Sequence, residues 1–155
     1  MRYSRMFTSF RVTLFGPVLL AMLVGLAALA SAATTVDVVL ADPSADSALQ
    51  RMTIIPSPDA VKAGTITFQV SNRSQKLVHE MIVVRQPAGG KPLPYNSRAQ
   101  RVVENRIKSL GEVSELYPGK SGKLTVNLGP GEYLLFCNQA GHYQSGMSAH
   151  LHVER

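Results

Sequence analysis

Apolar and polar residues alternate most regularly in residues 65–72, where polar side chains separate Ile66, Phe68 and Val70. A period of two predicts a strand with one buried face. Residues 77–84 are apolar at almost every position, so we expect a strand that is buried on both faces. Other short β-branched or apolar runs, closed by glycine, proline or polar residues, predict strands at 35–40, 51–55, 112–116, 123–128, 133–137 and 147–153.

A different pattern separates the strands expected at 77–84 and 112–116. Residues 86–96 contain three prolines and two glycines, which predicts a loop. Ser97 then resembles a helix N-cap, because Val102, Val103 and Ile107 follow at helical spacing and Gly111 ends the pattern. We therefore expect a short helix within an insertion that spans residues 86–110. The fold class expected from these elements is all-β, an antiparallel β-sandwich with one short inserted helix.

The N-terminal residues have the pattern of a secretory signal peptide. Arg2, Arg5 and Arg11 precede or border an apolar run at 12–29, and small residues follow at 30–32. We expect cleavage after residue 32, which places the mature chain in the periplasm or otherwise outside the cytoplasm. An uncleaved N-terminal membrane anchor is the alternative. The remaining chain is expected to comprise an extended segment at 33–50, with the first strand and a linker, and one domain at 51–155.

Composition and charge exclude several classes of protein. The whole chain has 16 Lys and Arg residues against 10 Asp and Glu residues, a net charge of +6. Removal of residues 1–32 leaves 13 basic and 10 acidic residues, a net charge of +3, with no basic run. This distribution argues against a nucleic-acid partner. The chain has one cysteine, which cannot form an intramolecular disulfide, so its thiol needs another explanation.

Four residues have the chemistry of a metal site. Cys137, His142 and Met147 follow the pattern C-x4-H-x4-M between two expected strands, and one loop could bring them together. His79 lies in an apolar strand 58 residues before Cys137 and needs a partner if it is buried. Two imidazoles, a thiolate and a weak thioether ligand are typical of a trigonal copper site with a long axial bond. A zinc site of the cysteine and the two histidines is an alternative.

The C-terminal strand also carries two histidines to which we assign no ligand role. His150 and His152 alternate with Ala149, Leu151 and Val153, which share a face with Met147. Side chains at alternate positions of a strand point to opposite faces. We therefore expect both histidines to face solvent.

These motifs resemble those of the cupredoxins, the small blue copper proteins. The resemblance rests on His79 in its strand, on the strand Gly-Glu-Tyr-Leu-Leu-Phe-Cys at 131–137 and on the loop at 140–147, and it covers roughly residues 61–153. It implies a Greek-key sandwich of two sheets with one copper ion near one end. It also implies that His79, Cys137 and His142 are equatorial ligands and that Met147 is the axial ligand.

The resemblance implies residues around the ligands as well. Many cupredoxins have asparagine after the first histidine, where this chain has Glu80, and we expect Glu80 and Asn138 to lie beside the ligands. The ring edge of His142 would reach the surface, and Gly141, Tyr143 and Gly146 suit a shallow docking patch.

The function implied is transfer of single electrons between transient redox protein partners by a monomer. Four protein ligands leave no open position for a substrate, so we expect no enzymatic turnover. The alternative from another class is a periplasmic copper chaperone or storage protein that delivers copper to an oxidase.

Overall fold

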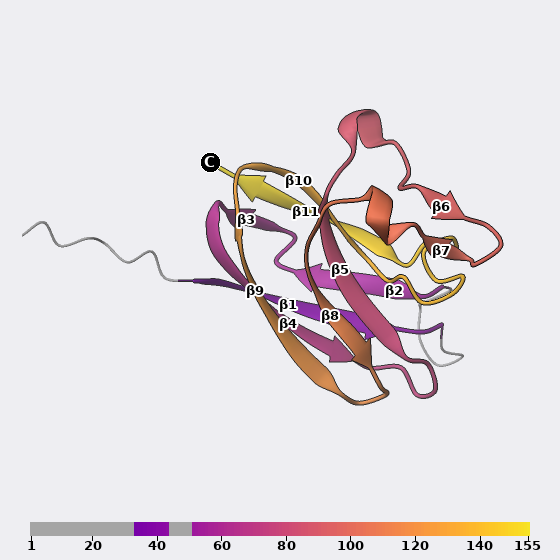
Figure 1. Ribbon diagram of the computed structural model, residues 1–155. Coiled ribbons are helices and arrows are strands. Elements are labelled where there is room, and N and C mark those ends of the chain that lie inside the picture. Colours follow the sequence, from indigo (N-terminus) through magenta and orange to yellow (C-terminus); the bar gives the residue numbers. More distant parts are fainter. Residues whose placement is uncertain (1–32, 44–50) are drawn as a thin grey trace, which may run out of the picture.

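The computed structural model describes residues 33–43 and 51–155 (Figure 1). The expected signal peptide at 1–32 and most of the expected linker lie outside the described residues. Within the two described ranges, no helix is both long enough and apolar enough to cross a membrane.

Most of the described chain forms a sandwich of two β-sheets (Figure 1). The four-stranded sheet has the order β2-β1-β4-β9, with bounds Thr53–Ser57, Thr34–Ala41, Gly64–Asn72 and Ser121–Leu128. The five-stranded sheet has the order β3-β11-β10-β5-β8, with bounds Ala60–Lys62, Ser148–Glu154, Gly131–Phe136, His79–Arg85 and Ser109–Leu116. The prediction of an all-β sandwich is confirmed.

Most neighbouring strands are antiparallel, but each sheet also contains one parallel pair. β1 runs parallel to β4, with Leu40 opposite Asn72, and β11 runs parallel to β3. β1 lies between β2 and β4, so the segment before residue 51 supplies an internal strand of the sandwich.

The main hydrophobic core lies between the two sheets. Ile66, Phe68 and Val70 are buried there, as the alternation in residues 65–72 predicts. From the other sheet, Met81 and Val83 of β5 join this core with residues of β10 and β11. A packed interface of this kind holds the strand ends that carry the candidate ligands in fixed positions.

A second hydrophobic core covers the outer face of β5 and β10. Ile82, Val84, Leu134 and Phe136 pack there against residues of the insertion, namely Leu93, Val102, Tyr95 and Ile107. Residues 79–84 are therefore buried on both faces, as predicted, whereas the expected strand at 77–84 is too long at its start, because Leu77 precedes β5 and is exposed. The insertion at 86–110 thus completes the burial of the five-stranded sheet.

The prediction of a helix within the insertion is wrong. Residues 95–102 form a small hairpin of β6 (Tyr95–Asn96) and β7 (Arg101–Val102), and short 3-10 turns lie at Ala88–Gly90 and Glu104–Arg106. The side chain of Asn138 accepts from the backbone N–H of Val102 at 2.6 Å and donates to its carbonyl at 3.1 Å. A helix would need both backbone groups for its own hydrogen bonds, so this long-range contact favours the extended conformation.

Candidate metal centre

The loop from Cys137 to Met147 joins β10 to β11 and carries three of the four candidate ligands. The backbone N–H of Cys137 donates to the carbonyl of Met147 at 3.2 Å, and the N–H of Met147 donates to the carbonyl of His142 at 3.0 Å. Gly141 and Gly146 have φ angles of +82° and +88°, a region in which glycine is favoured. These turns fold the loop back over the end of the sheet.

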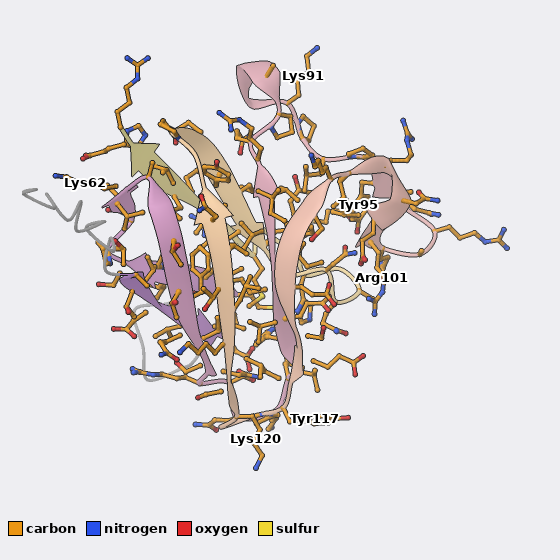
Figure 2. All side chains as sticks on the ribbon, turned by 60° about the vertical axis from the view of Figure 1, so that its left-hand side comes forward. Lys62, Lys91, Tyr95, Arg101, Tyr117 and Lys120 are labelled. Carbon is orange, nitrogen blue, oxygen red and sulfur yellow. The ribbon has the colours of Figure 1, made fainter. Side chains whose placement is uncertain are left out.

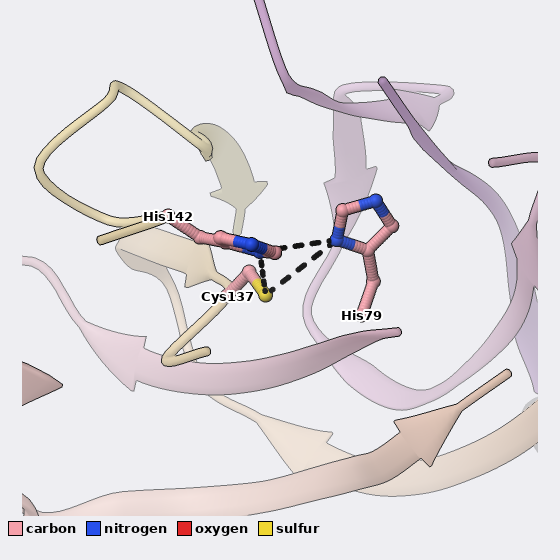
Figure 3. Close-up of side chains that lie close together, drawn as sticks. All are labelled: His79, Cys137 and His142. Atoms are coloured by element: carbon pink, nitrogen blue, oxygen red, sulfur yellow. Dashed lines mark hydrogen bonds between the residues drawn. The ribbon is translucent and has the colours of Figure 1, made fainter. Parts of the chain in front are cut away.

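The structure brings His79, Cys137 and His142 together (Figure 3). Nδ1 of His79 and Nδ1 of His142 lie 3.2 Å apart. Sγ of Cys137 lies 3.4 Å from Nδ1 of His142 and 4.0 Å from Nδ1 of His79. Three donor atoms from the start of β5 and from the loop after β10 therefore converge on one point.

The spacing of these donor atoms fits a single metal ion. Nitrogen and sulfur donors at roughly 2.0–2.3 Å from a common centre, in trigonal or tetrahedral arrangement, are separated by about 3.3–4.0 Å. Two of the observed separations, 3.4 and 4.0 Å, lie within this range, and the third, 3.2 Å, is about 0.1 Å below it. Soft thiolate with two imidazoles suits copper or zinc rather than magnesium or calcium.

Met147 is placed beside this group but its ligand role stays a prediction. Its side chain is fully buried in the same core cluster as Cys137. Its backbone is hydrogen bonded to both Cys137 and His142. His150 and His152, by contrast, are exposed on β11, as predicted.

The Cys137 thiol is held in an environment that disfavours its ionisation without a metal. Burial raises the pKa of Cys137 to about 11. The backbone N–H groups of Glu80 and Gln139 donate to the sulfur and partly oppose this effect. The same hydrogen bonds would reduce the charge on a metal-bound thiolate.

Glu80 connects the two chain segments that carry the ligands. The pairing of β5 with β8 shifts register between His79 and Met81: two steps along β5 match three steps along β8, so a bulge in β8 lies opposite Glu80. The carboxylate of Glu80 accepts the backbone N–H of Asn138. Burial is the main cause of the raised pKa of Glu80. Oε1 of Glu80 is buried without a hydrogen-bond partner. Glu80 and Asn138 each follow a candidate ligand directly, and their role beside a bound metal stays a prediction.

His142 differs from the other candidate ligands in its exposure. His79, Cys137 and Met147 are each 0% exposed, whereas His142 is partly exposed. Desolvation lowers the pKa of His142, and the neighbouring His79 lowers it further. The ring is therefore favoured in its neutral form, which can bind a metal.

The predicted docking residues surround His142 in the same loop. Gly141 and Gly146 form its turns, and Tyr143 follows His142 directly. The hydroxyl of Tyr143 accepts the backbone N–H of Leu93 at 3.2 Å, and its ring contacts Phe136 edge to face. Tyr143 therefore anchors the loop to the insertion, while its role in docking stays a prediction.

Asp42 is a residue of this site that the sequence analysis missed. Its Oδ1 lies 2.7 Å from Nε2 of His79, on the side of the ring opposite the donor group. Asp42 follows β1 in a small, polar stretch that resembles an ordinary surface loop. The one available signal is an acidic residue immediately after a buried strand.

No protein-family model matches this chain, and no curated protein matches it either. Solved structures do match. Reduced auracyanin from Roseiflexus castenholzii has 18% identity and a TM-score of 0.54, with 79% of this chain and 98% of that chain covered. Auracyanin B has 22% identity and a TM-score of 0.55, with 79% and 90% covered.

Rusticyanin from Thiobacillus ferrooxidans has 18% identity and a TM-score of 0.54, with 78% of each chain covered. Another structure of rusticyanin, described as a copper protein, has 17% identity and a TM-score of 0.55, with the same coverage. The chain therefore has the cupredoxin fold, the fold of auracyanin and rusticyanin.

Proposed function

We propose that this chain is a mononuclear blue copper protein that carries single electrons between redox partners. The observation that carries the proposal is the convergence of two imidazole nitrogens and one thiol sulfur within 3.2–4.0 Å at one end of a cupredoxin fold. The description of rusticyanin as a copper protein supports the choice of copper. His79, Cys137 and His142 would hold the ion, with Met147 as a weaker fourth ligand.

The protein's contribution is to hold these ligands still. When bound, copper supplies a one-electron couple between its cuprous and cupric forms. His79 and Cys137 lie at the ends of strands that are packed on both faces, and the loop of His142 is closed by backbone hydrogen bonds. Fixed ligand positions keep the structural change between oxidation states small, which favours rapid electron exchange.

The route for the electron is the ring of His142. Of the four proposed ligands, it alone is partly exposed, so a transient redox partner can approach closest there. The surrounding residues Gly141 and Gly146 have no large side chain that would keep a partner away. With four protein ligands and no open position, we propose no enzymatic turnover, and a monomer is the simplest form of such a carrier.

The proposed location is the periplasm or another compartment outside the cytoplasm. It rests on the signal-peptide pattern in residues 1–32. N-terminal sequencing of the protein from the membrane and soluble fractions of an expressing cell tests it. A mature chain that starts after residue 32 supports export with cleavage, and an intact N-terminus in the membrane fraction supports the anchor.

An absorption spectrum of the copper-loaded protein tests the function. We expect a visible thiolate-to-copper charge-transfer band, which is absent in Cys137→Ser and present in a control variant, His150→Gln, on the exposed face of β11. A colourless protein that binds only cuprous ion would refute the carrier and favour a copper chaperone. Binding of zinc with no stable copper complex would favour a zinc site.

A further inference from the structure

We infer that Asp42 is the positioning residue for His79: its carboxylate fixes the ring as the Nε2–H tautomer, so that Nδ1 presents a lone pair to the metal site. The inference rests on the proposed function only for the identity of the metal. It adds to that function the residue that orients the buried histidine.

The contact itself determines the direction of the hydrogen bond. Nε2 of His79 lies 2.7 Å from Oδ1 of Asp42, and His79 is fully buried. An ionised carboxylate only accepts hydrogen bonds, so the ring nitrogen must donate. In a neutral imidazole with its proton on Nε2, the other nitrogen has the free lone pair. That nitrogen, Nδ1, is the atom that faces Cys137 and His142.

Asp42 is itself held in place by the loop that leads to His79. Its Oδ2 accepts the hydroxyl of Ser74, which is buried. The same hydroxyl oxygen accepts the backbone N–H of Leu77 at 2.8 Å. The side chain of Asn72 accepts the N–H of Ser74 at 2.8 Å and donates to the carbonyl of Leu77. The end of β1 and the start of β5 are thus joined through one network that ends at the metal site.

The charge of Asp42 adds a second effect to the orientation of the ring. A carboxylate hydrogen bonded to a ligand histidine increases the electron donation of the ring to a metal. The effect favours a divalent ion over a monovalent one. Asparagine at this position could keep the hydrogen bond and remove the charge, so the two effects can be separated.

The tautomer is measured directly on the metal-free protein by ¹⁵N NMR of the histidine rings. We expect His79 to be the Nε2–H form in the wild type and in Asp42→Asn, and a mixture of forms in Asp42→Ala. Asp37→Asn is the matched control, because Asp37 is exposed on the same strand, β1. An Nδ1–H form in the wild type, or an unchanged tautomer in Asp42→Ala, would overturn the inference.

The consequence for metal binding is measured with Co²⁺ in competition with a chelator. We expect Asp42→Ala to weaken binding by about 10- to 100-fold and Asp42→Asn to weaken it less. If Asp42→Ala does not fold, the Co²⁺ affinity of Asp42→Asn is the test. If it equals the Co²⁺ affinity of Asp37→Asn, the charge of Asp42 has no role in metal binding. Neither readout uses copper or electron exchange, so a wild type without a copper band would refute the proposed function and not this inference.

A different observation, the distribution of charge, supports a second inference. The insertion at 86–110 has five basic residues and one acidic residue, a net charge of +4. The rest of residues 33–155 has eight basic and nine acidic residues, a net charge of −1. The basic residues of the insertion are Lys91, Arg98, Arg101, Arg106 and Lys108, and among the described residues none of them forms an ion pair.

Part of this charge, that of Arg101, lies next to the loop that carries the exposed ligand. The backbone N–H of Gly141 donates to the carbonyl of Gln100 at 2.8 Å, and the guanidinium of Arg101 donates to the side chain of Gln139 at 3.4 Å. Figure 2 shows Lys91 and Arg101 on the side of the insertion and Lys62 on the opposite side of the molecule. We propose that the insertion is a docking surface for an acidic face of the redox protein that meets His142, an inference that again rests on the proposed function.

Complementary charge would raise the rate of association and make it depend on salt. The probe is poly-glutamate, titrated into the ¹⁵N-labelled metal-free protein at low ionic strength. We expect shifts in residues 91–108 and 139–143, and affinity that falls with added salt. The double variant Arg98→Glu with Arg106→Glu should lose at least about tenfold in affinity. The control, Lys62→Glu with Arg155→Glu, makes the same change in net charge far from the insertion.

Equal losses in the two double variants would overturn the proposal, since the protein's net charge alone would then govern binding. Tighter binding to a short DNA duplex or to phosphatidylglycerol vesicles than to poly-glutamate would also overturn it. Because the titration uses the metal-free protein, it is independent of whether the protein exchanges electrons.

Discussion

Cys137 and Met147 are joined by a backbone hydrogen bond of 3.2 Å, from the N–H of the first to the carbonyl of the second. This bond extends the ladder of β10 and β11 beyond its last pair, Phe136 with Ser148. The thiol and the thioether therefore leave the sheet from positions that the sheet itself fixes. His142 lies between them along the loop and takes its position from the turn.

Replacement of Met147 by leucine tests its role as the fourth ligand. The volume is nearly conserved, so we expect a loss of less than about 1.5 kcal/mol in the free energy of unfolding of the metal-free protein. In the copper-loaded protein, loss of a donor disfavours the cupric ion more than the cuprous ion, and the reduction potential should rise. Zinc affinity should change little. Electrochemistry, the visible spectrum and zinc competition measure these effects, and an unchanged potential would show that Met147 is only a core residue.

The raised pKa of Cys137 predicts a slow reaction of the metal-free thiol. With a pKa of about 11, the thiolate fraction at pH 7 is about 100-fold lower than for a cysteine with the ordinary value of 9.0. The rate with Ellman's reagent should therefore be at least about 100-fold lower in the native protein than in the same protein unfolded in guanidinium chloride. Comparable rates in the two states would contradict the burial of this thiol.

The same pKa predicts how metal binding depends on pH. A metal must displace the proton of the thiol, so between pH 7 and 9 the apparent affinity should rise about tenfold per pH unit. His142 does not add to this slope, because its pKa is lowered and its ring is already neutral in that range. Competition titrations with Co²⁺ at several pH values measure the slope. Cys137→Ser is the control and should show a much smaller slope.

Burial of Glu80 predicts a loss of stability as the pH rises. Its pKa in the folded protein is raised above the ordinary value of 4.5, so above pH 4.5 the unfolded chain releases a proton that the folded chain retains. The stabilising contribution is complete below pH 4.5 and is lost as the pH rises through the raised pKa. Within this window Glu80→Gln should remove a slope of at most about 1.4 kcal/mol per pH unit.

Urea unfolding of the metal-free protein at a series of pH values measures this slope. Glu154→Gln is the matched control, because Glu154 is exposed at the end of β11. Glutamine retains an oxygen that can accept the N–H of Asn138, so the link between the two ligand segments is kept. If Glu80→Gln and Glu154→Gln show the same pH dependence, the burial of the carboxylate does not govern stability.

Gly122 marks a close approach between β9 and β8. A Cβ atom at Gly122 would lie 2.4 Å from Cγ1 of the buried Val113. Because Val113 has a branched, packed side chain, we expect Gly122→Ala to lower the free energy of unfolding by about 1–3 kcal/mol. Gly129→Ala is the control, since a Cβ atom at Gly129 would have open space within 4 Å and the φ of this residue is not positive. Equal stabilities of the two variants would show that the contact relaxes at little cost.

The parts of the structure that follow from local sequence were the parts that could be predicted. The alternation of Ile66, Phe68 and Val70 determines which face of β4 is buried. Cys137 and His142 lie close in the chain, so one turn between two strands is enough to bring them together. His79 could be joined to them because a buried imidazole needs a partner.

The parts that depend on contacts between distant residues could not be predicted. Val102 has the spacing of a helical residue, but its backbone groups bond to Asn138, which lies 36 positions away. Asp42 has almost no local signal, because its role comes from the meeting of β1 and β5 through Ser74. In both cases a polar side chain takes a specific long-range partner that composition and periodicity do not reveal.

The two apolar layers on either side of β5 and β10 determine the order in which the protein opens. Amide hydrogens at 81–84 and 133–136 are shielded by the main core on one side and by the insertion on the other. Segments of this kind exchange with deuterium only when the whole molecule unfolds, whereas exposed loops open at little cost. We therefore expect the strands next to His79 and Cys137 to be the last to exchange, so that these two candidate ligands stay in register through every partial opening short of global unfolding.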